Sequence, residues 1–235
     1  MFFSLDTVVM IAAVLGSSDT FHPRWLAFRE HRSGSKMVVT TSVYSEYEAR
    51  VEGIGRTDGS IGRVETIVRD LYLAASMIRG SMGSKETLPP LVRGLRLNQH
   101  TDSIVREIVE RGSDPGAIAD RIRSIANKFD FEVMVRKGEF LSSVSIDGPR
   151  DQGKVHSTEL SLTAELGEGG DSWKHDVRHI AETHILSMEL GDPAHFVTED
   201  RSHFKPRRVV RILELLGGRT IQTICDLECK SLAIT

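Results

Sequence analysis

The stretch Phe196-Val197-Thr198-Glu199-Asp200 decides the fold that we expect for this chain. Two apolar residues run into a hydroxyl and two acids, shortly after the turn-like Gly191-Asp192-Pro193. This pattern predicts a short buried strand with a carboxylate at its C-terminal end. In an open α/β sheet, ligands gather at that end of the strands.

Two further strands are expected to lead to acidic residues in the same way. Residues 2–7 (FFSLDT) open the chain and include Asp6, and residues 37–40 (MVVT) run towards Glu46. Asp176 lies near the start of a helical pattern. If the strands are neighbours, acids that are far apart in the sequence converge on one spot. These acids are Asp6, Glu46, Asp176 and Asp200.

Strands and helices alternate over much of the chain. Strands are expected at residues 2–5, 37–40, 196–198 and 220–224. Apolar residues at helical spacing predict helices at residues 7–15, 23–31, 43–51, 61–78, 101–110, 113–129, 173–188 and 209–216. Alternation of this kind predicts an α/β fold with a central parallel sheet flanked by helices.

The middle of the chain does not alternate cleanly. Residues 131–135 and 140–146 look like strands, and residues 155–166 fit either a strand or a helix. We therefore expect residues 85–170 to form a large mixed insertion or subdomain. The core is then formed by the two remaining segments, residues 1–84 and 171–235.

The composition is that of an ordinary soluble globular protein. The chain has 235 residues, of which 40% are hydrophobic and 27% are charged. This length is enough for one full core, or for one domain that carries a large insertion. No stretch approaches the roughly 18 uninterrupted apolar residues of a membrane span, so we expect no membrane partner.

The apolar N-terminus, residues 1–16, does not have the pattern of a secretory signal. No Lys or Arg precedes the apolar run, and Asp6 interrupts it. The two cysteines, Cys225 and Cys229, have no second pair with which to complete a four-ligand zinc site. We interpret them as reduced thiols in a cytoplasmic protein.

The net charge of −3 means that a nucleic acid would have to bind at a local basic patch. A cluster of this kind follows Asp200 directly, and its members are Arg201, Lys205, Arg207, Arg208 and Arg211. These side chains could bind phosphates. The other interpretation is the solvated start of a helix. The interleaved His203 and Phe204 could stack on bases, although a core position also fits Phe204.

Clustered carboxylates are suited to the hydrolysis of a phosphodiester. The reaction needs an activated water and a group that stabilises the charge developing on phosphorus, and carboxylates that hold Mg²⁺ or Mn²⁺ provide both. Without a metal ion the cluster is unfavourable, because like charges repel and raise one another's pKa. Taken singly, each acid also has a structural explanation, such as capping a helix or beginning a turn.

The acidic positions resemble the four motifs of the PIN-domain ribonucleases. The resemblance lies in Leu5-Asp6-Thr7 after the first strand, Glu46 early in the helix after the second strand, residues 176–181 (DVRHIA), and residues 196–200 (FVTED). It implies a central parallel sheet flanked by helices, and cleavage of RNA that depends on Mg²⁺ or Mn²⁺.

The same resemblance implies roles for individual residues. The metal-binding and catalytic acids would be Asp6, Glu46, Asp176 and Asp200. Thr198 would be a polar residue beside the last of these acids. The candidates for substrate binding are then Thr198, Arg201, Lys205, Arg207 and Arg208.

The chain departs from the family pattern in the interval between Glu46 and Asp176, which is longer than a minimal PIN domain needs. Glu48 is also a rival of Glu46. On a helix, two positions differ by about 200°, so only one of these two side chains can face the site. We prefer Glu46, because Tyr47 and Val51 then occupy the neighbouring packed face.

Other interpretations stay open. Glu199 is a rival of Asp200 in the last motif. His175 and His179 are four residues apart, as a zinc pair on a helix would be. The doublet His175-Asp176 also resembles that of the helical HD-type phosphohydrolases, but the strand signals argue against that fold.

The sequence therefore predicts a cytoplasmic, metal-dependent endoribonuclease whose partner is RNA. A protein partner or a homodimer is also compatible with it. The alternative is a catalytically inert PIN-like module for RNA binding or assembly.

Overall fold

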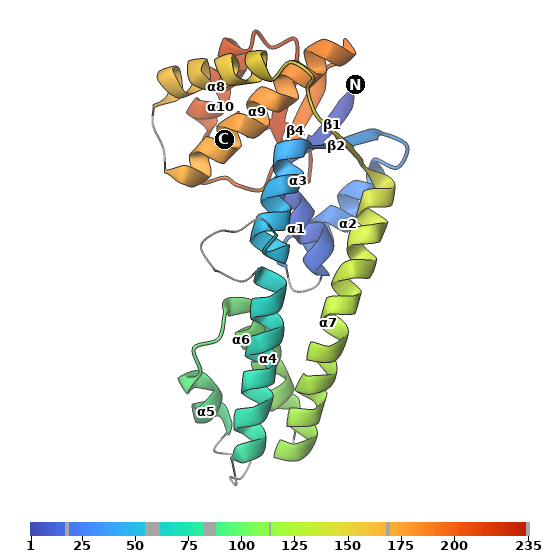
Figure 1. Cartoon of the computed structure of the whole chain (residues 1–235), viewed down its shortest axis with the longest axis vertical. Coiled ribbons are helices and arrows are strands. Elements are labelled where there is room, and N and C mark those ends of the chain that lie inside the picture. The colour runs from blue at the N-terminus through green and yellow to red at the C-terminus, as the bar shows by residue number, and fades with distance from the viewer. Residues whose placement is uncertain (17–18, 55–61, 82–87, 113, 168–169, 234–235) are drawn as a thin grey trace. The chain divides into compact units, whose positions relative to one another are not determined.

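The computed structural model describes residues 1–16, 19–54, 62–81, 88–112, 114–167 and 170–233. The chain divides into two compact units, which we describe separately (Figure 1). The first unit contains residues 1–47 and 137–235, and the second contains residues 48–136. In the described part of the chain, no helix is both long and apolar enough to cross a membrane.

A five-stranded parallel sheet forms the centre of the first unit, with the strand order β3-β2-β1-β4-β5. The strands are β1 (Phe2–Leu5), β2 (Lys36–Thr40), β3 (Ser145–Asp147), β4 (Ala194–Val197) and β5 (Ile221–Cys225). The helices of this unit are α1 (Thr7–Leu15), α2 (His22–His31), α3 (Thr41–Tyr47), the last part of α7 (Pro115–Ser143), α8 (Gln152–Leu166), α9 (Asp171–Leu190) and α10 (Pro206–Leu215). The expected α/β fold with a central parallel sheet flanked by helices is therefore confirmed.

The register of the sheet brings the ends of β1 and β4 together. Leu5 pairs with Val197, so Asp6 and Thr198 follow neighbouring strands at the same edge of the sheet. The main-chain N–H of Asp6 donates to the carbonyl of Val197 at 3.0 Å and extends the pairing by one residue. All four residues of β1 are buried, as expected for an inner strand of a parallel sheet that is covered on both faces.

Helices cover both faces of this sheet. Successive residues of a strand point to opposite faces. The hydroxyl of Ser4 meets that of Thr183 on α9, whereas the ring of Phe3 meets that of Phe28 on α2. The helices α9 and α2 therefore lie on opposite faces, and Figure 1 shows them on the two sides of β1 and β2.

One apolar cluster joins β4 and β5 to the helices α8, α9 and α10. The rings of Phe196 on β4 and Phe204 are 5.7 Å apart within it. The buried members of this cluster are Leu162, Trp173, Val177, Ile180, Phe196, Phe204, Val209, Ile212, Ile221, Ile224 and Leu232. This cluster packs α9 against β4, the strand that leads into residues 198–200.

All the regular secondary structure in the described part of the second unit is helical. The helices are η2 (Glu48–Glu52, a π-helix), α4 (Arg63–Gly80), α5 (Leu88–Gly94), α6 (Gln99–Arg111) and the first part of α7. The buried Asp70 of α4 accepts hydrogen bonds from the main-chain and side-chain nitrogens of Asn98, just before α6. The helices expected at residues 61–78, 101–110 and 113–129 are confirmed in their described residues, although residues 61 and 113 lie outside these.

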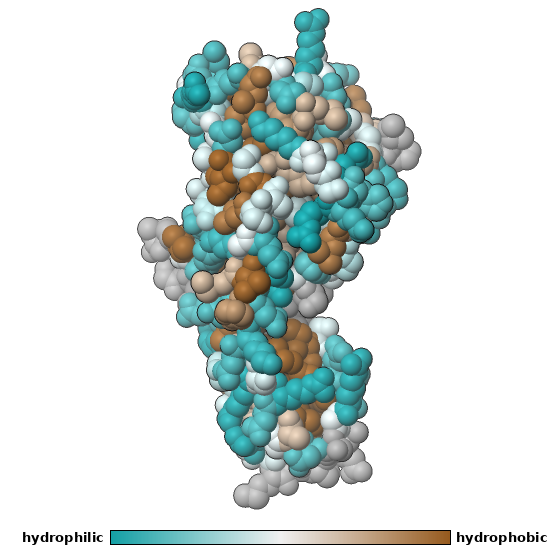
Figure 2. Space-filling view, turned by 90° about the vertical axis from the view of Figure 1, so that its right-hand side faces the viewer, coloured by the Kyte–Doolittle hydropathy of each residue, from teal (hydrophilic) through white to brown (hydrophobic). Residues whose placement is uncertain are grey.

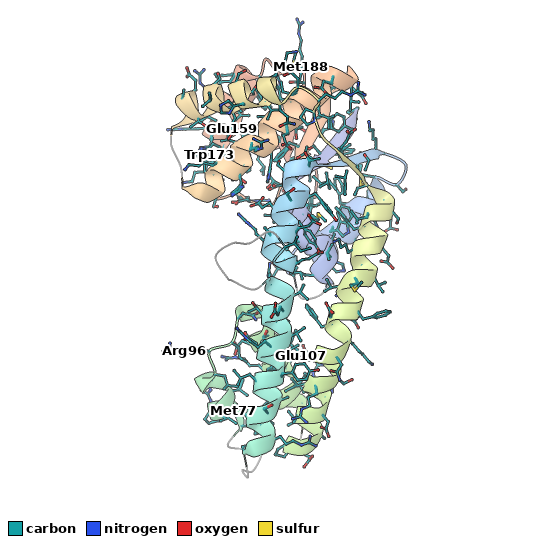
Figure 3. All side chains as sticks on the ribbon, in the orientation of Figure 1. Met77, Arg96, Glu107, Glu159, Trp173 and Met188 are labelled. Carbon is teal, nitrogen blue, oxygen red and sulfur yellow. The ribbon has the colours of Figure 1, made fainter. Side chains whose placement is uncertain are left out.

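Some apolar side chains of the second unit are exposed, and Figure 2 shows apolar areas between polar ones on one face of the molecule. Met77 on α4 is one of them and is labelled in Figure 3. The others include Tyr72, Leu73, Phe131, Met134 and Val135. Scattered exposed apolar residues are normal on protein surfaces, so they do not by themselves indicate a partner.

Two expected strands are largely helical. The strand expected at residues 131–135 is wrong, because these residues lie inside α7. Of the strand expected at residues 140–146, only the end takes part in β3. Val133 and Phe140 are both buried and lie seven residues apart, which is two helical turns, so the apolar residues here also fit a helix. Residues 155–166, which fit either type, lie in α8.

The compact units do not follow the boundaries expected at residues 85 and 170. The helix α8 packs against α9 and α10, and its Val155 forms a buried cluster with Ala181 and Ile185 of α9. The helix α4 packs instead against α5, α6 and η2. The unit outside the sheet is therefore 48–136 rather than 85–170.

We expect Phe196→Ala to destabilise the first unit by about 3–5 kcal/mol, because it leaves a cavity where β4 meets the apolar cluster. Both tryptophans of the chain, Trp25 and Trp173, belong to the first unit, so their fluorescence during urea unfolding reports on that unit. Leu160→Ala is the control, because Leu160 on α8 is 57% exposed and its removal should change stability by less than about 0.5 kcal/mol. Equal losses in the two variants would contradict this packing.

Candidate metal centre

Asp6 lies directly after β1 and is the N-cap of α1. Its Oδ1 accepts a hydrogen bond of 2.7 Å from the N–H of Thr7. The hydroxyl of Thr198 donates to Oδ2 at 2.7 Å, and Nδ1 of His179 lies 3.1 Å from Oδ1. Asp6 therefore both caps a helix and joins β1 to α9 and to the end of β4.

The Asp6 carboxylate is buried and is nevertheless held in its charged form. Burial on its own raises the pKa of Asp6, but the hydrogen bond and the charge of His179, with the hydrogen bonds of Thr198 and Thr7, lower it further than burial raises it. The net result is a pKa below the ordinary value. The site thus contains a fixed negative charge that is 2% exposed.

Glu46 on α3 faces the same place. The hydroxyl of Thr7 donates to its Oε2 at 2.5 Å, and Nε2 of His179 lies 3.3 Å from the same oxygen. The buried Glu182 of α9 positions this helix, because its Oε2 accepts hydrogen bonds from the N–H and the hydroxyl of Ser42, one turn before Glu46. The rival Glu48 belongs to the second unit.

Asp176 and Asp200 form a second pair of acids beside the first. Nδ1 of His203 lies 2.5 Å from Oδ2 of Asp176 and 3.2 Å from Oδ2 of Asp200. Oδ1 of Asp200 accepts hydrogen bonds from the N–H groups of Ser202 and His203, and its own N–H donates to the hydroxyl of Thr198 at 3.0 Å. Asp200 therefore begins a turn and also faces Asp176.

The side chains could hold a cation in two overlapping groups. Possible ligand atoms of Asp6, Asp176 and His179 lie within 4.8 Å of one another, and the same holds for Asp176, Asp200 and His203. Asp176 belongs to both groups. Glu46 joins the first group through its contact with His179. The structure therefore brings together all four of the acids that the sequence singled out.

These donors fit a divalent cation. Carboxylate oxygens are the usual protein ligands of Mg²⁺ and Mn²⁺, and four clustered carboxylates repel one another without a counter-charge. Nε2 of His179 is also buried and makes no hydrogen bond with any described residue. A buried polar atom without a hydrogen bond is costly, and coordination of a metal ion would satisfy it.

The structure corrects the role expected of Thr198 and decides between Asp200 and its rival Glu199. Thr198 is fully buried, and its hydroxyl binds Asp6 and the N–H of Asp200, so it holds the acids and is not accessible to a substrate. The rival acid Glu199 accepts hydrogen bonds from the N–H of Leu227 and from Nη1 of Arg24. Its carboxylate is thus engaged with α2 and the segment after β5.

The basic residues after Asp200 do not form one uniform patch. Arg201 pairs with Asp226 at 2.7 Å. The guanidinium of Arg208 lies 4.2 Å from the ring centre of Trp173, near the start of α9 (Figure 3), and donates to the carbonyl of His203. The side chains of Lys205 and Arg207 are exposed at the start of α10.

Sequence reasoning did not assign His179 and His203 to the site. The spacing of His175 and His179 suggested a zinc pair, but His175 is exposed while His179 is buried, so the two do not act together. The useful signal was a histidine three residues after each of two acids, Asp176 and Asp200. Asp176 and His179 lie on α9, where a spacing of three places two side chains on one face, whereas Asp200 and His203 lie in a turn.

In comparisons with known proteins, no family model, no curated protein and no solved structure matches this chain.

We expect Thr198→Val to destabilise the first unit by about 1.5–3 kcal/mol at pH 7, because a buried carboxylate loses a hydrogen-bond donor. The pKa of Asp6 is lowered on folding, so its contribution is complete above its ordinary pKa and is lost as the pH falls through the lowered one. The part of the loss that involves Asp6 should therefore shrink under acid conditions. Urea unfolding at pH 7 and at successively lower pH values measures it.

Thr198→Ser is the matched control for this prediction, because it keeps the hydroxyl and should be close to the wild type at every pH. A loss in Thr198→Val that does not shrink at any acid pH at which the protein is still folded would contradict the interaction with a charged Asp6.

Proposed function

We propose that this chain is a metal-dependent endoribonuclease of the PIN type that cleaves RNA phosphodiesters by an activated water. The observation that supports this most is the convergence of Asp6, Glu46, Asp176 and Asp200, which come from four separate elements, at the C-terminal edge of a parallel sheet. In open α/β sheets this edge is where active sites are found.

In this proposal Asp6, Glu46, Asp176 and Asp200 hold Mg²⁺ or Mn²⁺. When bound, the ion lowers the pKa of a water and neutralises charge on the phosphate. Thr7 fixes the carboxylate of Glu46, and Thr198 fixes that of Asp6. Such hydrogen bonds keep the acids oriented and reduce the cost of ordering them when substrate binds.

RNA is the proposed substrate because cations follow the last acid directly in the chain. Lys205 and Arg207 are exposed at the start of α10, where they can contact phosphates on either side of the cleaved bond. Arg208 is partly buried and helps to shape the site through His203 and Trp173. We further propose a cytoplasmic location.

The alternative of an inert RNA-binding or assembly module uses the same cations but gives no role to the acids. Gathering four carboxylates without a metal ion costs free energy through repulsion and burial. A module that only binds RNA gains nothing from that cost. The enzyme is therefore the function that the geometry supports best.

Asp6→Asn and Asp200→Asn should each reduce the cleavage of a labelled single-stranded RNA in Mg²⁺ or Mn²⁺ by at least about a hundredfold, because each removes a charged ligand. The control is Glu165→Gln, an exposed acid on α8 that pairs with Arg211 and should keep full activity. Circular dichroism checks that all three variants are folded. Tight RNA binding by the wild type without any cleavage would favour the inert module.

Arg207→Ala should weaken RNA binding and reduce the slope of log K against log salt by about 0.7, because one phosphate contact is lost. Fluorescence anisotropy with single-stranded RNA measures this in the Asp200→Asn background, where cleavage is blocked. Arg211→Ala is the matched control on the same helix, because Arg211 already pairs with Glu165 and Glu214. Equal salt slopes for Arg207→Ala and its parent would argue against a role for this residue.

A further inference from the structure

Two histidines divide the four acids into two pairs. His179 lies between Asp6 and Glu46, with Nδ1 at 3.1 Å from one carboxylate and Nε2 at 3.3 Å from the other. His203 lies between Asp176 and Asp200, with Nδ1 at 2.5 Å and 3.2 Å from the two carboxylates. Each pair of acids therefore has an imidazole ring beside it, and in both rings Nδ1 is the nitrogen that donates to a carboxylate.

The hydrogen bonding of His179 leaves one nitrogen directed at the site. The carboxylate of Asp6 can only accept, so Nδ1 of His179 donates to it. Metal-binding histidines commonly donate their other ring nitrogen to a carboxylate in this way. Nε2 is then the atom available as a ligand, and it is buried without a hydrogen bond to any described residue.

The spacing of Nε2 and Glu46 Oε2 fits two ligands of one ion. They are 3.3 Å apart, and the contact is not a hydrogen bond. Two ligands that are each roughly 2.1 Å from a metal ion, at a right angle to each other, are about 3 Å apart.

We propose that His179 and His203 are nitrogen ligands of the divalent centre, one beside each pair of acids, and that the centre therefore selects a transition-metal ion over Mg²⁺. This deepens the proposed function by naming its metal class and donor atoms. Mg²⁺ strongly prefers oxygen ligands, whereas imidazole suits Zn²⁺, Cu²⁺, Fe²⁺ and Ni²⁺. His175 on the same helix is exposed and serves as a built-in comparison.

The experiment uses the full chain and Mn²⁺, whose unpaired electrons report on bound nitrogen. Electron spin echo envelope modulation of the Mn²⁺-loaded protein should show strong ¹⁴N coupling from a directly bound imidazole. The ¹⁴N signal should disappear when the protein is grown with ¹⁵N-histidine. Bound Mn²⁺ without any ¹⁴N coupling would overturn the inference and leave the proposed ribonuclease, with oxygen ligands alone, standing.

Histidine variants then show which residue gives the ¹⁴N coupling. His203→Ala should weaken it and lower Mn²⁺ affinity by at least about tenfold, with little effect on Mg²⁺ affinity, whereas His175→Ala should change neither. An unchanged coupling in His203→Ala would overturn the assignment of that residue. His179 is buried, so His179→Gln could unfold the protein. The site as a whole is therefore tested by the spectra of the wild type with ¹⁴N-histidine and with ¹⁵N-histidine.

The same measurements separate this inference from the proposed function. If the protein binds no Mn²⁺, both the inferred histidine ligands and the proposed metal-dependent mechanism are wrong. If Asp6→Asn and Asp200→Asn still cleave RNA, the proposed catalytic centre is wrong, whatever the spectrum shows. Equal affinities for Mg²⁺ and Ni²⁺ in the wild type would overturn the inferred selectivity.

Discussion

The buried carboxylate of Asp6 is the interaction on which the rest of the site depends. A charge removed from water is stable only if hydrogen bonds and opposite charge replace the lost hydration. Here they come from Thr7 on α1, Thr198 after β4 and His179 on α9. Three elements that also pack through apolar residues are thus held to a common polar centre. The fold sets the position of the Asp6 carboxylate. The hydrogen bonds that this carboxylate accepts in turn stabilise the fold.

Two more contacts extend this centre to the other acids. The hydroxyl of Thr198 donates to Asp6 and accepts from the N–H of Asp200, so one side chain orients the acids that follow two neighbouring strands. On the other side, Glu182 of α9 binds Ser42 at the start of α3, which also carries Glu46. The helix α9 therefore contributes directly to the site and also positions a neighbouring helix that does so.

The parts of the fold that were predictable from the sequence are those in which local pattern and burial agree. Short apolar runs that end in an acid predict inner strands, and the carboxyl ends of parallel strands share one edge, so the acids that follow them meet there. The end of α7 was not predictable in this way, because a short apolar run such as residues 131–135 fits a buried strand as well as a segment of a helix. These residues belong to a long helix, α7, and a short stretch of sequence does not show how far that helix extends.

The unit boundaries and the histidines were missed for a different reason. Which unit α8 joins depends on the long-range packing of residues such as Val155, which no local pattern contains. His179 and His203 depend on which way a ring faces, and on the sequence alone a histidine beside an acid is equally compatible with solvent, core or ligand. Thr198 was singled out by its place beside an acid, but its burial, and hence its role in orienting Asp6, became visible only in three dimensions.

The strand order has one more consequence for where the acids lie. From β1 the chain builds the sheet outward through β2 and β3 on one side, and β4 and β5 extend it on the other. The direction of growth therefore reverses between β1 and β4, which makes this pair the topological switch point of the sheet. Asp6 follows one of these two strands, and Thr198 and Asp200 follow the other. The charged centre thus lies at the junction of the sheet where successive crossovers diverge, and in open α/β sheets ligands bind at that junction.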